Sequence, residues 1–137
     1  MYLATSIAQW TIRLTGVTQV VLGLLFWSGR AYTLLPLHMA VGMTFVIALW
    51  VLTALAARAG LPMRWALAWV GLGIVIPLFG TIHPRILPGP NHWIIRVIHL
   101  LIGLVAMIIA ARLASYIRSR PRGRRAAPPH SDVLNAA

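Results

Sequence analysis

The sequence of 137 residues contains no cysteine, no lysine and a single acidic residue, Asp132. Without cysteine, neither a disulfide framework nor a thiolate metal site is available. The basic residues are twelve arginines, and the formal net charge is +11. Because Asp132 stands near the end of the chain, the arginines that precede it have no acidic side chain close to them in the sequence.

Charge of either sign is scarce, whereas apolar residues are abundant. Charged residues make up 9% of the chain, hydrophobic residues 60%, and the mean hydropathy is +0.85. A soluble domain of this size could not cover so much apolar surface. Four apolar segments, at about 6–28, 33–57, 62–83 and 92–116, each have the length of about 20 residues that a bilayer crossing requires.

These segments predict an all-α integral membrane protein, a four-helix bundle with up-down-up-down topology. Residues 1–117 form its one transmembrane domain, and 118–137 an Arg-rich disordered tail. The start of the chain lacks the basic region and the cleavage site of a signal peptide, so the first apolar segment is expected to be a real span. The predicted location is the cell's inner (plasma) membrane, with several crossings.

The distribution of arginine predicts the orientation in the membrane. Arg58, Arg64 and the tail cluster lie on one side of the predicted spans, and Arg30 and Arg85 lie on the other. The positive-inside rule then makes both termini cytoplasmic. In a soluble protein this charge would suggest nucleic acid as the partner, but a basic segment beside a membrane helix is expected to face anionic lipid. That segment holds Arg112, Arg118, Arg120, Arg122, Arg124 and Arg125.

One face of the last apolar segment changes character along its length. Its early part carries imidazole and guanidinium, whereas its later part carries only small residues, which suit close contact between membrane helices. The small residues are therefore expected to close the bundle. In order, the face consists of His92, Arg96, His99, Gly103, Ala106, Ala110 and Ala114.

Two histidines in different spans are matched in depth and in local sequence. With helices two and four both descending from the outer side, His38 lies about 8 Å and His99 about 11 Å below the outer boundary. Glycine follows each histidine by four residues, at Gly42 and Gly103, and would leave clearance for a macrocycle. Neutral imidazole is an iron ligand, and bundle cores commonly house cofactors. We therefore expect His38 and His99 to bind one haem b.

Arginines near the same boundary support this expectation. Arg96 precedes His99 by one turn, Arg30 and Arg85 lie in the outer loops, and half-buried arginines need anions. Two haem propionates would supply them through charge-assisted bonds. His92 is a candidate for a propionate bond or a proton relay. His83 is a weaker candidate because polar residues are ordinary at a membrane interface, and His130 is expected to be solvated.

With His38 and His99 in two helices of a four-helix protein, the chain resembles the small b-type membrane cytochromes of the cytochrome b561 group. That resemblance implies electron exchange with quinones, ascorbate, superoxide or a partner enzyme. Members of the group generally carry two haems and four axial histidines, whereas this sequence offers one clear pair. A single outer haem would exchange electrons between the quinone pool and an outer-face partner, act as a quinone or superoxide oxidoreductase, or serve redox sensing.

Other functions stay open. A small transporter or proton-conducting protein would use Arg13, Gln19 and the histidines as a polar path. A structural or assembly subunit of a larger membrane complex would dock through the basic tail, and a homo-oligomer in which two copies share a site is compatible with the sequence. Copper is a poorer metal, because Met39 and Met43 do not share a face with His38; methionine in an apolar helix usually packs.

Overall fold

The computed structural model describes residues 1–120, and these residues are almost entirely helical. The all-α prediction is confirmed: the order is α1 (Tyr2–Trp27), η1 (Tyr32–Leu34), α2 (Leu35–Arg58), α3 (Met63–Ile82), η2 (His83–Arg85) and α4 (His92–Ser119), where η marks a 3₁₀-helix. Four of these helices are long and apolar enough to cross a membrane, which suggests a multi-pass membrane protein. The predicted tail beyond residue 120, with His130 and Asp132, lies outside the described residues.

The first helix begins, and the last helix ends, a few residues outside the predicted apolar segments, whereas the other helix ends lie within two residues of the predicted ones. The first helix starts at Tyr2 rather than near residue 6, and the Thr5 hydroxyl donates a hydrogen bond to the Met1 carbonyl oxygen at 3.0 Å. The last helix continues to Ser119, beyond the apolar segment that ends near residue 116. Hydropathy marks the part of a helix that suits lipid, and backbone hydrogen bonding extends past it.

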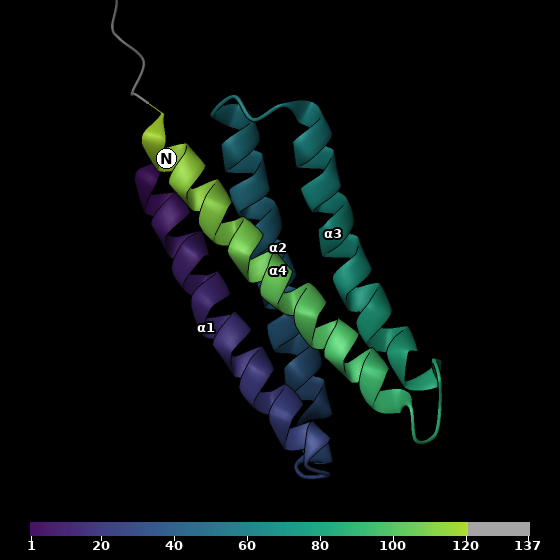
Figure 1. Ribbon diagram of the computed structural model, residues 1–137. Coiled ribbons are helices and arrows are strands. Elements are labelled where there is room, and N and C mark those ends of the chain that lie inside the picture. Colours follow the sequence, from purple (N-terminus) through teal and green to yellow (C-terminus); the bar gives the residue numbers. More distant parts are fainter. Residues whose placement is uncertain (121–137) are drawn as a thin grey trace, which may run out of the picture.

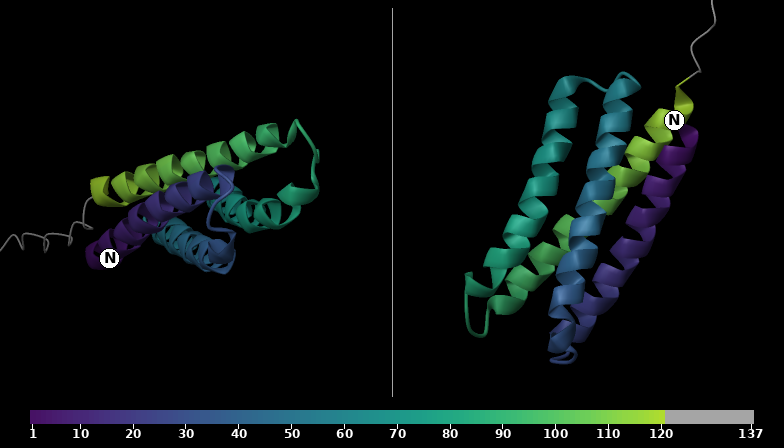
Figure 2. Two further views of the ribbon diagram at one scale, coloured as in Figure 1. Left: turned by 90° about the horizontal axis from the view of Figure 1, so that it is seen from below. Right: turned by 180° about the vertical axis from the view of Figure 1, so that it is seen from behind.

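Consecutive helices run in opposite directions, and α4 crosses the bundle diagonally (Figures 1 and 2). The connections α1–α2 and α3–α4 lie at one end of the bundle, which we call the two-loop end. The N-terminus, the α2–α3 connection and the end of α4 lie at the opposite end, which we call the terminal end. In Figure 1, α4 starts beside α3 at the two-loop end and finishes beside α1 at the terminal end.

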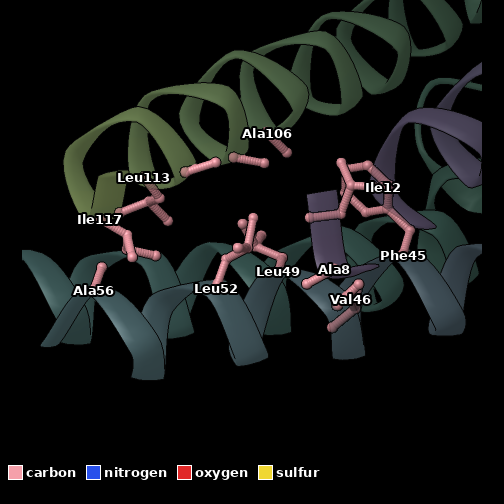
Figure 3. Close-up of a cluster of buried hydrophobic side chains, with 13 residues drawn as sticks. Ala8, Ile12, Phe45, Val46, Leu49, Leu52, Ala56, Ala106, Leu113 and Ile117 are labelled. Carbon is pink, nitrogen blue, oxygen red and sulfur yellow. The ribbon is translucent and has the colours of Figure 1, made fainter. Parts of the chain in front are cut away.

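The apolar core lies where α4 crosses α2 and α1 (Figure 3). In this view Leu113 and Ile117 extend from α4 toward Leu52 and Ala56 on α2. The predicted role of the small residues on α4 is confirmed, because exposure is 0% at Ala106, 1% at Ala110 and 0% at Ala114. Small side chains allow this close helix approach.

The outward surface of the bundle is apolar. Large side chains such as Leu14, Leu67 and Ile108 are 66%, 63% and 59% exposed. Soluble monomers rarely expose apolar patches of more than a few hundred Å². In a lipid bilayer the same side chains would contact acyl chains instead of water, so their exposure would not be unfavourable.

Candidate functional site

His38 lies in the first turn of α2, at the two-loop end, and its ring is half-buried. The edge of this ring meets the Phe26 ring of α1, with centroids 5.3 Å apart and planes at 66°. The side-chain amide of Gln19 donates a hydrogen bond to the His38 carbonyl oxygen at 2.7 Å. The contacts from α1 therefore hold both the ring and the backbone of His38.

The glycine that follows His38 makes room for the Gln19 amide. A Cβ added at Gly42 would lie 2.5 Å from Gln19 Nε2, which is too close for any carbon and nitrogen that are not bonded. Gly103, the corresponding glycine after His99, is surrounded differently: an added Cβ there would meet no atom within 4 Å. The sequence predicted that both glycines leave space beside the histidines. The space at Gly42 is filled by the Gln19 side chain, whereas the space at Gly103 is open.

His99 lies on α4 against the end of α3. Its ring stacks on Phe79 at a centroid distance of 5.8 Å and on His83 at 5.2 Å, with planes within 14° and 10° of parallel. The ring also lies close to Gly80, where an added Cβ would make a van der Waals contact of 3.4 Å with His99 Cε1. The last turn of α3 thus provides one wall of the His99 site.

The structure brings the predicted pair together across the bundle. The ring centroids of His38 and His99 lie 6.5 Å apart, with planes tilted by 43°. In both residues Nδ1 is buried and has no hydrogen-bond partner among the described residues. Leaving a buried polar atom without a hydrogen bond lowers the stability of the fold by about 1–3 kcal/mol. Two such nitrogens side by side therefore indicate a site whose nitrogens need a partner from outside the described residues.

His83 and His92 extend the pair into a line of four imidazoles. His83 stacks on His92 with centroids 5.8 Å apart, so that the order is His38, His99, His83, His92. We call this set the histidine line. His83 Nδ1 lies 2.8 Å from the Gly80 carbonyl oxygen, and His92 Nδ1 lies 3.2 Å from that of Ile86. Since a carbonyl oxygen only accepts, Nδ1 donates in both rings and Nε2 carries the lone pair.

Sequence reasoning gave His83 too little weight. It precedes Pro84 at a loop, a position that is usually exposed, yet its ring lies directly on that of His99. The signal that was available is the short α3–α4 connection, because the end of one helix and the start of the next must then be neighbours. What the sequence does not contain is the rotation of α3 that turns His83 inward.

The histidine line does not form a site for a bare metal ion. Within residues 1–120, no three side chains of the metal-binding types are grouped closely enough to hold one. His83, His92 and His99 stack by their faces, so their nitrogens do not point to a common centre. Met39 and Met43 are 56% and 46% exposed, which agrees with a packing role toward lipid rather than with a copper site.

Three arginines gather at the same end of the bundle. Arg96 is half-buried on α4, and Arg30 and Arg85 are exposed in the two separate loops. The arginine contacts found within residues 1–120 belong to Arg13, Arg118 and Arg120. Arg30, Arg85 and Arg96 therefore have no partner in the described part of the chain, where the sequence also contains no acid.

Comparison of the chain with protein families, with curated proteins and with solved structures finds no match. The function must therefore be argued from the geometry of the site.

Proposed function

We propose that this chain is a multi-pass protein of the cell's inner (plasma) membrane that binds one b-type haem through His38 and His99 and transfers electrons. The observation that carries the proposal is the pair of half-buried imidazoles, 6.5 Å apart, whose Nδ1 atoms have no partner. Neutral imidazole nitrogen is a ligand of haem iron, and the two rings bring such a donor from α2 and from α4 to the same place. The donor set therefore fits a haem iron, which needs only two ligands from the protein.

The surroundings of the pair suit a cofactor that is apolar at its centre and anionic at its edge. Phe26 and Phe79 pack against the two imidazoles and would exclude water from them. Arg96, with Arg30 and Arg85, would bind the propionates by charge-assisted hydrogen bonds, and His92 would join them only in its protonated form, in which Nε2 also donates. Gly103 leaves open space one turn beyond His99.

When bound, the haem would supply one-electron redox chemistry. His38 and His99 would both be ligands of the haem, so the residues here would orient the group and tune its potential rather than activate oxygen. Under the positive-inside rule the two-loop end faces outward and both termini are cytoplasmic. The redox partners proposed for this location are the quinone pool and a molecule or protein at the outer face, with superoxide as one such molecule.

The histidine line also favours a second function, proton conduction. A continuous path would have to cross the terminal half of the bundle, where Leu49 and Leu52 are 0% exposed and Ala106 closes the other side. Arg13 offers no continuation, because its guanidinium lies over the Trp10 ring, 5.0 Å from the centroid. This apolar barrier weighs against conduction. Proton flux into proteoliposomes made with cofactor-free protein would reverse that judgement.

Optical spectroscopy of the protein purified in detergent from haem-sufficient cells tests the proposal. A low-spin b-type spectrum with one haem per chain is expected, and His38→Ala and His99→Ala should each abolish the low-spin signal. The matched control is His92→Ala, at the end of the histidine line, which should keep it. A colourless protein that takes up no haem on reconstitution would refute the proposal.

A further inference from the structure

A cleft of about 320 Å³ lies between α3 and α4 toward the terminal end of the bundle. At this end α4 leans across to α1 and away from α3 (Figures 1 and 2). The cleft is far along α4 from the histidine line. Its lining includes Trp65 and Trp69 of α3 and Ile109, Arg112, Leu113 and Tyr116 of α4.

The walls of the cleft are flat and apolar. Trp65 and Trp69 stand one turn apart on α3, and their rings stack with centroids 5.6 Å apart. Ile109 and Leu113 provide the facing wall on α4. Such walls suit an acyl chain, and tryptophan and tyrosine are enriched at the level of lipid headgroups.

One charged group lines this apolar cleft, the guanidinium of Arg112. Arg118 and Arg120, which follow on the same helix, have partners: Arg118 donates to Gln9 Oε1 at 2.6 Å, and Arg120 donates to the Tyr116 hydroxyl. Within residues 1–120, Arg112 makes no hydrogen bond or ion pair, and this part of the sequence has no acid. Arg112 is exposed, so its charge is available to an anion from outside the described chain.

We propose that the cleft binds an anionic phospholipid, with the phosphate on Arg112 and an acyl chain against Trp65 and Trp69. Charge complementarity selects this occupant. A neutral isoprenoid quinone would fill the walls but leave the positive charge of Arg112 without a counter-charge, and a free phosphate would leave the walls uncovered. Basic sites between membrane helices on the cytoplasmic side bind anionic headgroups in this way. This inference is independent of the haem proposal.

Lipid retention measured by native mass spectrometry tests the inference. The full chain is exchanged into micelles that contain equal amounts of phosphatidylglycerol and phosphatidylcholine, and the retained lipids are counted. We expect one phosphatidylglycerol, retained about fivefold over phosphatidylcholine, as one arginine near an anionic surface provides. Arg112→Gln should remove this preference and Arg112→Lys should restore part of it. Trp69→Ala should weaken retention of both lipids.

Arg58→Gln is the matched control, because Arg58 is also exposed at the terminal end but does not line the cleft. It should keep the preference. Equal retention of the two lipids by the unmodified chain would overturn the inference, as would an equal loss in Arg58→Gln and Arg112→Gln. If a quinone is retained and Arg112→Gln does not change its retention, the cleft binds a different ligand. If glycerol phosphate competes as strongly as the whole lipid, the apolar walls contribute nothing to binding.

Discussion

The His83 ring lies 5.2 Å from the His99 ring, with the two planes within 10° of parallel. One ring comes from the 3₁₀ turn that follows α3 and the other from the second turn of α4. The hydrogen bond from His83 Nδ1 to the Gly80 carbonyl oxygen holds the first ring in place. His83 therefore acts as a support that sets the orientation of His99.

Removing this support should loosen His99. We expect His83→Ala to lower the haem content and to broaden the low-spin signals in electron paramagnetic resonance, because the imidazole of His99 would gain freedom to rotate. His83→Phe keeps a flat ring at the same place and should restore much of the signal. A phenylalanine variant no better than the alanine variant would show that stacking is not what positions His99.

Replacing one proposed axial ligand should change the redox potential rather than the presence of the haem. In His38→Met the thioether would bind in place of imidazole, and a methionine ligand raises the potential of a haem relative to bis-histidine ligation. Redox titration followed by absorbance measures the shift. Leu37→Met is the control, because it places the same thioether at an exposed neighbouring position, and it should titrate like the unmodified protein; a shift of equal size in both variants would contradict the assignment of His38.

Arg96 should raise the proposed haem's potential by its charge. Reduction adds one negative charge, which a nearby guanidinium stabilises, so Arg96→Gln should lower the midpoint potential by an amount on the order of tens of millivolts. Arg58→Gln changes the same charge at the terminal end of the bundle and should leave the potential unchanged. High salt screens an exposed charge more than a half-buried one, so the effect of Arg96 on the midpoint potential should persist at high salt better than that of an exposed arginine.

The Gln19 amide and Gly42 should be coupled in stability. A methyl group at Gly42 would displace the amide and break its 2.7 Å bond to the His38 carbonyl oxygen, so Gly42→Ala should lower the free energy of unfolding in detergent by about 1–3 kcal/mol. Adding Gln19→Ala should cost less than the sum of the two single changes. Gly23→Ala is the control, because open space surrounds Gly23, and it should not destabilise.

The small face of α4 should tolerate no enlargement. Ala110 is 1% exposed in the core, and Ala110→Leu should therefore destabilise the bundle by about 1–3 kcal/mol. Ala111→Leu adds the same atoms at the next residue, which is exposed, and should be nearly neutral. Chemical unfolding in detergent followed by circular dichroism compares the two; equal losses would show that α4 is not packed by this face.

The sequence by itself determined the four membrane-length helices within residues 1–120 and where their apolar parts lie. Hydropathy depends on local composition, and a bilayer crossing requires a run of about 20 apolar residues whatever packs around it. The buried face of Ala106, Ala110 and Ala114 was predictable for a similar reason, since helical periodicity alone places these residues together. The helix ends at Tyr2 and Ser119 were not, because backbone hydrogen bonding carries a helix past the stretch that hydropathy marks.

Part of the candidate site, too, was predictable from the sequence, and part of it was not. The match in depth between His38 and His99 follows from helix rise and loop order, which the sequence contains. Only the tertiary structure decided that His83 lies on His99, that Gly42 admits Gln19, and that α4 leans away from α3 near the cleft beside Arg112. Each of these depends on how a helix is rotated or tilted against its neighbour. Such angles arise from side chains packing across helices far apart in the sequence, and no local pattern of residues contains them.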